Sequence, residues 1–167
     1  NNERVYGFLG IPSGQGPFPV IALYPGAGAG RGVPVDIGLT SRGEIVMMMN
    51  VHKYPVAESP AEAKKQLEQY IARHKASKYI SVGASSRETF HFYSILSGFC
   101  RALDYVCSRG DWWDGKHLVI SGSSQGGFLT LAMSSLYADK VTSAMAGVPY
   151  LCDSSRNRPA GDRAILG

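Results

Sequence analysis

The composition of this chain fits one folded domain. Its 167 residues, 44% of them hydrophobic and 18% charged, suffice for one hydrophobic core and are too few for two, and no apolar stretch approaches the roughly 20 residues of a transmembrane helix. The net charge is +4, but the basic residues are scattered and do not alternate with aromatic ones. We therefore expect no nucleic-acid partner and no membrane association.

Three strands are predicted in the first third of the chain. Residues 5–11 are rich in β-forming side chains, and residues 20–24 form a continuous apolar run, which is typical of a strand buried on both faces of a parallel sheet. A glycine-rich loop at residues 25–32 follows the second strand. Residues 44–50 predict the third strand.

Two helices are predicted before residue 110. Ser59 is a helix cap followed by Pro60 at the first helical position, and Glu62 completes a capping box. Residues 85–88, Ser-Ser-Arg-Glu, repeat the pattern and predict the start of a second helix, whose apolar side chains recur at helical spacing from residue 92 to residue 106.

The last third of the chain contains a motif of chemical interest. The apolar run at residues 117–121 predicts a strand that leads into Gly122-Ser123-Ser124-Gln125-Gly126, a G-x-S-x-G sequence. A helix through residues 128–137 and a strand at residues 141–148 follow, and residues 149–167 show little periodicity. The alternation of strands and helices without any repeat predicts an α/β fold with a mostly parallel sheet, in one domain covering residues 1–167.

The three cysteines do not form a recognisable metal or disulfide pattern. Cys100 and Cys107 are seven residues apart in a helical pattern, so we expect both on its buried side. The odd count and the lack of C-x-x-C spacing argue against a zinc site and a disulfide framework, although a single disulfide of Cys152 stays open. We expect no metal and no cofactor.

A G-x-S-x-G sequence between a strand and a helix is typical of the nucleophile elbow of a serine hydrolase. Ser124 is then the candidate nucleophile, and the backbone N–H of Gln125, at the start of the helix, is the first candidate donor to an oxyanion. The glycine-rich loop is placed to supply the second donor, the N–H of Ala27. The alternatives are an ordinary serine in a turn and a simple strand-to-helix loop; a phosphate-binding loop is disfavoured because its Lys-Ser/Thr is absent.

The chain resembles carbohydrate esterase family seven, the acetyl xylan esterase and cephalosporin C deacetylase family. Three stretches carry the resemblance: residues 23–32, residues 101–105 leading through 113–116, and Ser124-Gln125-Gly126-Gly127. It spans about residues 4–153. The resemblance implies an α/β-hydrolase fold, deacetylation of small acetylated carbohydrates without a cofactor, a homo-oligomer in the full-length protein, and a secreted or periplasmic location.

The same resemblance implies that Ser124 is the nucleophile and that the N–H groups of Gln125 and Ala27 form the oxyanion hole. Two departures stand out, since the family usually has tyrosine at the position of Ala27 and its R-G-Q motif is missing near residues 51–54. The role at Ala27 belongs to the backbone, so the different side chain does not remove it. The missing R-G-Q motif indicates a divergent branch and leaves substrate preference open. The catalytic acid and the His-Glu motif of the family fall beyond residue 167.

A hydroxyl nucleophile needs a base, and in α/β-hydrolases an acid and then a histidine follow the serine in sequence. No histidine follows Ser124 here. Three carboxylates follow Ser124: Asp139, Asp153 and Asp162. Asp139 and Asp153 fit surface or turn positions better than a catalytic role. The histidines all precede Ser124: His52, His74, His91 and His117. Only His52, after a predicted strand end, is placed to face the site. We therefore expect a hydrolase domain that is incomplete on its C-terminal side.

Three functions remain open from the sequence. The first is a serine esterase that removes acetyl groups from acetylated xylo-oligosaccharides or related small esters. The second is another serine hydrolase of the same fold, either a short-acyl esterase or one similar to dipeptidyl peptidases. The third is a hydrolase-like module that binds a partner without catalysis.

Overall fold

A five-stranded, mostly parallel sheet forms the centre of the computed structural model, which describes residues 4, 6–27, 38–51, 55–73 and 79–150. Its strands are β1 (Gly7–Gly10), β2 (Phe18–Tyr24), β3 (Ile45–Met49), β4 (Trp113–Ser123) and β5 (Ser143–Gly147). Their spatial order is β1-β3-β2-β4-β5. Only β1 runs antiparallel to its neighbour, β3; all other pairs are parallel. The predicted α/β class with a mostly parallel sheet is confirmed.

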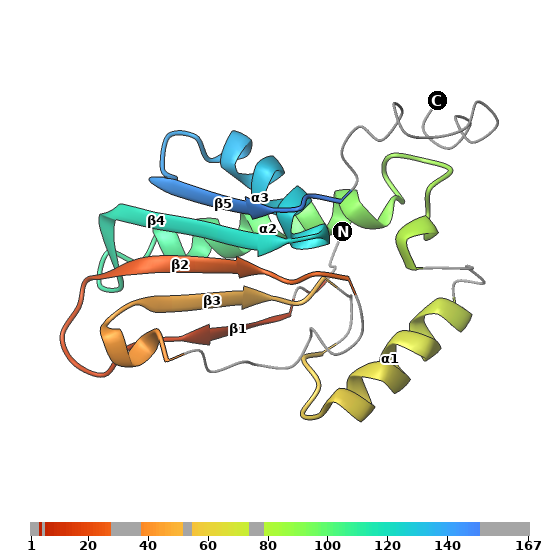
Figure 1. Ribbon diagram of the computed structural model, residues 1–167, viewed down its shortest axis with the longest axis horizontal. Helices are drawn as coiled ribbons and strands as arrows, with labels where there is room; N and C mark the ends of the chain where they lie inside the picture. Colours follow the sequence, from red (N-terminus) through yellow and green to blue (C-terminus); the bar gives the residue numbers. More distant parts are fainter. Residues whose placement is uncertain (1–3, 5, 28–37, 52–54, 74–78, 151–167) are drawn as a thin grey trace.

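Within the described residues, three α-helices accompany the sheet: α1 (Pro60–Arg73), α2 (His91–Cys107) and α3 (Gln125–Leu136). The short 3₁₀ helices η2 (Thr40–Arg42) and η3 (Tyr79–Ser81) lie in connecting segments of the same part of the chain. Figure 1 shows α2 and α3 behind the sheet, whereas α1 lies beside it. No helix in the described part of the chain combines the length and the apolar character needed to cross a membrane.

The first predicted helix start is confirmed and the second is wrong. The N–H of Glu62 donates to Ser59 Oγ at 3.2 Å, and the Glu62 carboxylate accepts from the N–H of Glu58 at 2.9 Å. Helix α2, in contrast, begins at His91 after an extended Phe90 with no side-chain cap. In the segment predicted to start it, Ser86 Oγ instead accepts from the N–H of Glu88 at 3.2 Å, which closes a local turn.

The main core lies between the sheet and helices α2 and α3. Its central strands β2, β3 and β4 and both helices contribute side chains with no exposed surface: Val20, Ala22, Ile45, Leu118, Ile120, Phe99, Leu103, Leu129 and Met133. At roughly 1.5–3 kcal/mol for each large side chain, this burial is the main force that holds the sheet against the helices. The core therefore fixes the end of β4 and the start of α3 relative to β2.

The half-buried Cys100 and Cys107 lie on α2, as predicted, and burial raises the pKa of both thiols. Cys152 lies outside the described residues. A small second cluster, formed by Tyr70, Tyr79 and Val82, joins α1 to η3 and the turn that follows it.

Candidate active site

The G-x-S-x-G sequence forms a tight turn between β4 and α3. Strand β4 ends at Ser123 and α3 begins at Gln125, so Ser124 alone connects them, with φ 58° and ψ −119°. This conformation is rare for a residue with a side chain and costs of order 1–3 kcal/mol. Backbone hydrogen bonds hold it, because the N–H of Ser124 donates to the Gly147 carbonyl and the Ser124 carbonyl accepts from the N–H of Tyr150, both at 2.9 Å.

Two glycines of the motif are required by close contact with β2. A Cβ at Gly122 would lie 2.7 Å from the carbonyl oxygen of Tyr24 and 2.5 Å from that of Gly126. A Cβ at Gly126 would overlap the same Tyr24 oxygen. The first turn of α3 therefore packs directly on the end of β2, and only glycine allows this approach.

The loop after β2 reaches Ser124. A Cβ at Gly26 would lie 4.0 Å from the Cβ of Ser124, which is ordinary van der Waals distance. Ala27, next in the chain, is exposed. Residues 28–32 of the glycine-rich loop lie outside the described residues. The structure thus brings Ser124, Gln125 and the start of this loop to one sheet edge.

The N-terminus of α3 presents the backbone N–H of Gln125 next to Ser124. The N–H of Gln125 has no hydrogen-bond acceptor within the described part of the chain. The N–H groups of a helix N-terminus carry partial positive charge and favour an anion. The arrangement can therefore stabilise negative charge that develops on an oxygen beside Ser124.

The side chain of Gln125 points away from solvent and meets a residue that sequence reasoning did not select. Gln125 is completely buried, and its Oε1 accepts a hydrogen bond from the hydroxyl of Tyr79. Burial, with a smaller contribution from nearby Tyr150, raises the pKa of Tyr79 to about 12. No sequence spacing links the two residues, because 46 positions separate them.

Each histidine that the structure describes contacts a residue other than Ser124. His117 lies in β4, seven residues before Ser124, which places it on the order of 20 Å away along the strand. Its Nδ1 lies 2.6 Å from Asp114 Oδ2. His91 is buried, and its Nδ1 lies 3.0 Å from the Tyr70 hydroxyl. His52 and His74 lie outside the described residues.

Of the carboxylates after Ser124, the structure describes Asp139. Asp139 is 69% exposed and pairs with Lys140 at 2.6 Å, as a surface carboxylate does. Asp153 and Asp162 lie outside the described residues. Among the residues described, no group of three His, Cys, Asp or Glu side chains is placed to hold a metal ion.

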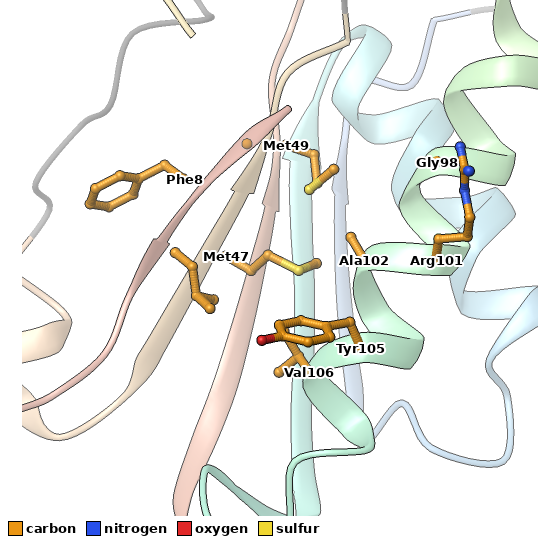
Figure 2. Close-up of a pocket in the computed structure, with 10 residues that line it drawn as sticks. Phe8, Met47, Met49, Gly98, Arg101, Ala102, Tyr105 and Val106 are labelled. Carbon is orange, nitrogen blue, oxygen red and sulfur yellow. The ribbon is translucent and has the colours of Figure 1, made fainter. Parts of the chain in front are cut away.

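A cavity of about 490 Å³ lies elsewhere in the molecule, between β1, β3 and α2. Figure 2 shows Met47 and Met49 on the sheet side and Ala102 and Tyr105 on the helix side. None of its lining residues belongs to the elbow or to the loop after β2. Because β2 separates β3 from β4 in the sheet, this cavity is distinct from the site at Ser124.

Comparison with known proteins identifies the family. The model of the acetyl xylan esterase (AXE1) family matches residues 1–162. The chain belongs to the acetyl xylan esterase family. It is similar to acetyl esterase Axe7A of Xylanibacter ruminicola, with 30% identity over 155 residues that cover 90% of this chain and 34% of that protein.

Solved structures agree with this assignment. An acetyl xylan esterase from Paenibacillus sp. R4 superimposes with a TM-score of 0.67 and 26% identity, over 90% of this chain and 46% of that one. Dienelactone hydrolase from Anabaena variabilis, with a TM-score of 0.50 and 18% identity over 81% of this chain and 53% of that one, shares the fold. The α/β-hydrolase fold is thereby confirmed. The chain spans about a third to a half of the length of these proteins.

Proposed function

We propose that this protein is a serine esterase that removes acetyl groups from acetylated xylo-oligosaccharides or related small acetyl esters, with Ser124 as nucleophile. The observation that carries the proposal is the strained turn at Ser124, next to an N–H of Gln125 that has no acceptor in the described residues. Strain of this kind persists only where the surrounding structure enforces it, and it is concentrated at functional sites. Family membership supports the ester chemistry.

The reaction follows from this geometry. Ser124 Oγ attacks the carbonyl carbon of the acetyl group, and the C=O electron pair moves onto oxygen, which becomes an oxyanion. The N–H groups of Gln125 and Ala27 donate hydrogen bonds to that oxyanion. The oxyanion then collapses, the sugar hydroxyl leaves with a proton, and the acetyl group stays on Ser124 until water hydrolyses the acyl-enzyme. No metal or cofactor takes part in these steps.

A base must take the proton of Ser124 and return it to the leaving sugar oxygen. His91 and His117 are committed to Tyr70 and Asp114. In α/β-hydrolases an acid and then a histidine follow the serine in sequence, and no histidine follows Ser124 here. We therefore assign the base and its acid partner to a histidine and a carboxylate outside the 167 residues, in line with the greater length of the relatives. The isolated chain should then hydrolyse a chromogenic acetate ester no faster than its Ser124→Ala variant.

Replacement of Ser124 tests the proposal in the intact protein, by which we mean the 167 residues together with the residues proposed to supply the base and the acid. Ser124→Ala should lower kcat on p-nitrophenyl acetate and on acetylated xylose by at least about 1,000-fold, as expected for loss of a nucleophile. Ser124→Gly serves as a second variant that also lacks the hydroxyl but tolerates the positive φ, so its loss of activity cannot be attributed to backbone strain at this position. Retention of activity in both variants would refute the proposal.

Side-by-side substrates separate the remaining alternatives. Acetylated xylose, a butyrate or longer acyl ester, and a dipeptide amide are assayed with the same intact protein. A kcat/KM that is highest on the acetylated sugar supports deacetylation. A preference for the longer ester or the peptide would refute deacetylation of sugars as the activity and favour the other serine hydrolases. The absence of Ser124-dependent turnover on all three substrates would favour a binding module.

A further inference from the structure

A buried hydrogen bond connects η3 to the first residue of α3. The Tyr79 hydroxyl donates to Oε1 of Gln125, and the two residues are 8% and 0% exposed. Gln125 is also the residue whose backbone N–H faces the space beside Ser124 in the proposed reaction. The bond therefore acts on the oxyanion donor through the side chain of the same residue.

The position of Tyr79 is itself fixed by packing. Its ring meets the His91 ring edge-on, with centroids 5.5 Å apart and an interplanar angle of 72°. His91 in turn contacts the hydroxyl of Tyr70 on α1 at 3.0 Å. The order of contacts is Tyr70, His91, Tyr79, Gln125, and it joins α1, α2, η3 and α3. A phenol held on several sides can impose one orientation on the amide that it contacts.

The Gln125 side chain has few other constraints. Its Nε2 has no hydrogen-bond partner within the part of the chain that the structure describes. Within the described residues, the hydrogen bond from Tyr79 is therefore the polar contact that favours one rotamer of the buried Gln125 amide. Loss of the bond would leave a second buried polar atom of the same amide unsatisfied, which favours a change of rotamer.

We propose that Tyr79 is a positioning residue for the esterase reaction: it holds the side chain of Gln125 so that the Gln125 N–H points at the oxyanion. The inference rests on the proposed function, because it presupposes attack by Ser124. Tyr79 touches no reacting atom. Its contribution is the orientation of a backbone donor, and a misplacement of about 1 Å at such a donor can lower the rate about 100-fold.

Tyr79 is distinguished from an acid or base by its protonation state. With a pKa of about 12, raised by burial, the phenol stays protonated throughout the pH range in which esterases are assayed. It remains a hydrogen-bond donor across that range. The kcat of the intact enzyme should therefore keep the same pH profile after Tyr79 is replaced by phenylalanine, only at a lower level.

Steady-state kinetics of the intact protein test this role. Tyr79→Phe removes one oxygen and should lower kcat on p-nitrophenyl acetate about 10-fold, with KM changed less than 2-fold, since the lost interaction acts only in the transition state. The matched control is Tyr93→Phe, which removes the same atom from an exposed side chain and should leave both constants unchanged. A kcat for Tyr79→Phe within 2-fold of the parent, or a rise in KM alone, overturns the inference.

A second variant and a double variant show whether Tyr79 acts through Gln125. Gln125→Met keeps the backbone N–H and the side-chain length but removes the amide, and it should lower kcat to a similar extent. The double variant should lose about 10-fold rather than the 100-fold expected of independent effects. A 100-fold loss overturns the inference. If Tyr79→Phe fails to fold, Gln125→Met alone decides, since an unchanged kcat refutes the role.

Ser124→Ala distinguishes failure of the proposed esterase function from failure of the positioning role of Tyr79. If Ser124→Ala stays active, the proposed function fails and the role of Tyr79 fails with it. If Ser124→Ala is inactive while Tyr79→Phe has normal kcat, the esterase proposal stands and only the positioning role is refuted.

Discussion

Helices α1 and α3 begin in opposite ways. At the start of α1, Ser59 Oγ accepts from the N–H of Glu62, and the Glu62 carboxylate accepts from the N–H of Glu58. At the start of α3, no side chain caps the helix, and Ser124 takes a positive φ. At the start of α1, side chains accept from backbone N–H groups, whereas the N–H of Gln125 has no acceptor within the described part of the chain.

The difference shows that residues near the helix start determine where α1 begins, whereas contacts with the rest of the fold determine where α3 begins. Helix α1 lies beside the sheet (Figure 1) and begins with residues that favour a helix start by themselves. Helix α3 is held by the contact of Gly126 with the Tyr24 carbonyl and by the bond from Ser124 to Gly147. An uncapped start that is enforced by β2 and β5 keeps N–H groups available for a ligand, and a capped start does not.

The largest expected effect is on the contact that enforces the α3 start. Gly126→Ala should lower the free energy of unfolding of the intact protein by about 3 kcal/mol, because the new Cβ overlaps the Tyr24 carbonyl oxygen. The gain of about 1 kcal/mol in helix propensity from glycine to alanine is too small to offset this. Urea unfolding followed by circular dichroism measures the change.

Gly110 provides the control for that substitution. A Cβ at Gly110 would meet no atom within 4 Å. Gly110→Ala should therefore change the free energy of unfolding by less than about 1 kcal/mol. If Gly126→Ala is as stable as Gly110→Ala, backbone contact does not hold the start of α3 and the comparison of the two helices breaks down.

The two capping-box patterns show what a local motif can and cannot predict. Ser59 caps α1 as predicted, and Pro60 favours the helical conformation after the cap. The Glu62 carboxylate accepts from the N–H of Glu58 instead of that of Ser59, so the second bond of the box is shifted by one residue. In the second pattern, Ser86 bonds to Glu88 only two residues away, and α2 starts later, at the buried His91. Packing of the apolar face of α2 against the sheet decides where that helix begins, and sequence alone does not contain that information.

The candidate active site likewise has one part that the sequence predicts and one part that it does not. The turn at Ser124 was predictable because strand, glycines and helix are contiguous in sequence, and the approach of Gly26 follows from the parallel order of β2 and β4. The bond between Tyr79 and Gln125 was not predictable, since it joins residues 46 positions apart and depends on how η3 packs. Short-range geometry was accessible from the sequence, and long-range polar contacts were not.

A smaller effect is expected at the start of α1. Ser59→Ala removes the oxygen that accepts from the N–H of Glu62 and should cost about 1 kcal/mol of unfolding free energy, with kcat of the intact protein unchanged. The control is Ser97→Ala inside α2, where Ser97 Oγ donates to the Tyr93 carbonyl at 2.8 Å and alanine suits the helix equally well. Equal stability of Ser59→Ala and the parent would show that the cap contributes nothing measurable.

The smallest effect is expected at the turn that begins β4. There a titratable carboxylate, Asp114, accepts hydrogen bonds from backbone N–H groups. Asp114 Oδ1 accepts from the N–H groups of Lys116 and His117 at 2.9 and 2.8 Å. Burial opposes ionisation of Asp114, but the hydrogen bonds from His117 and Lys116 outweigh it and hold its pKa below the usual range. A carboxyl group with a lowered folded-state pKa stabilises the protein above its unfolded pKa of about 3.9, and this stabilisation is lost as the pH falls through the folded value.

Asp114→Asn should therefore cost about 0.5 kcal/mol at pH 7, and its difference from the parent should shrink as the pH falls below about 4. Urea unfolding at a series of pH values between 7 and 3 measures this. A difference that persists unchanged at pH 3 would mean that the charge of Asp114 is not the stabilising feature. The contacts of Ser124 and Gly126 that hold the elbow are backbone groups without a titrating proton, so the cost of Gly126→Ala should stay constant over the same series.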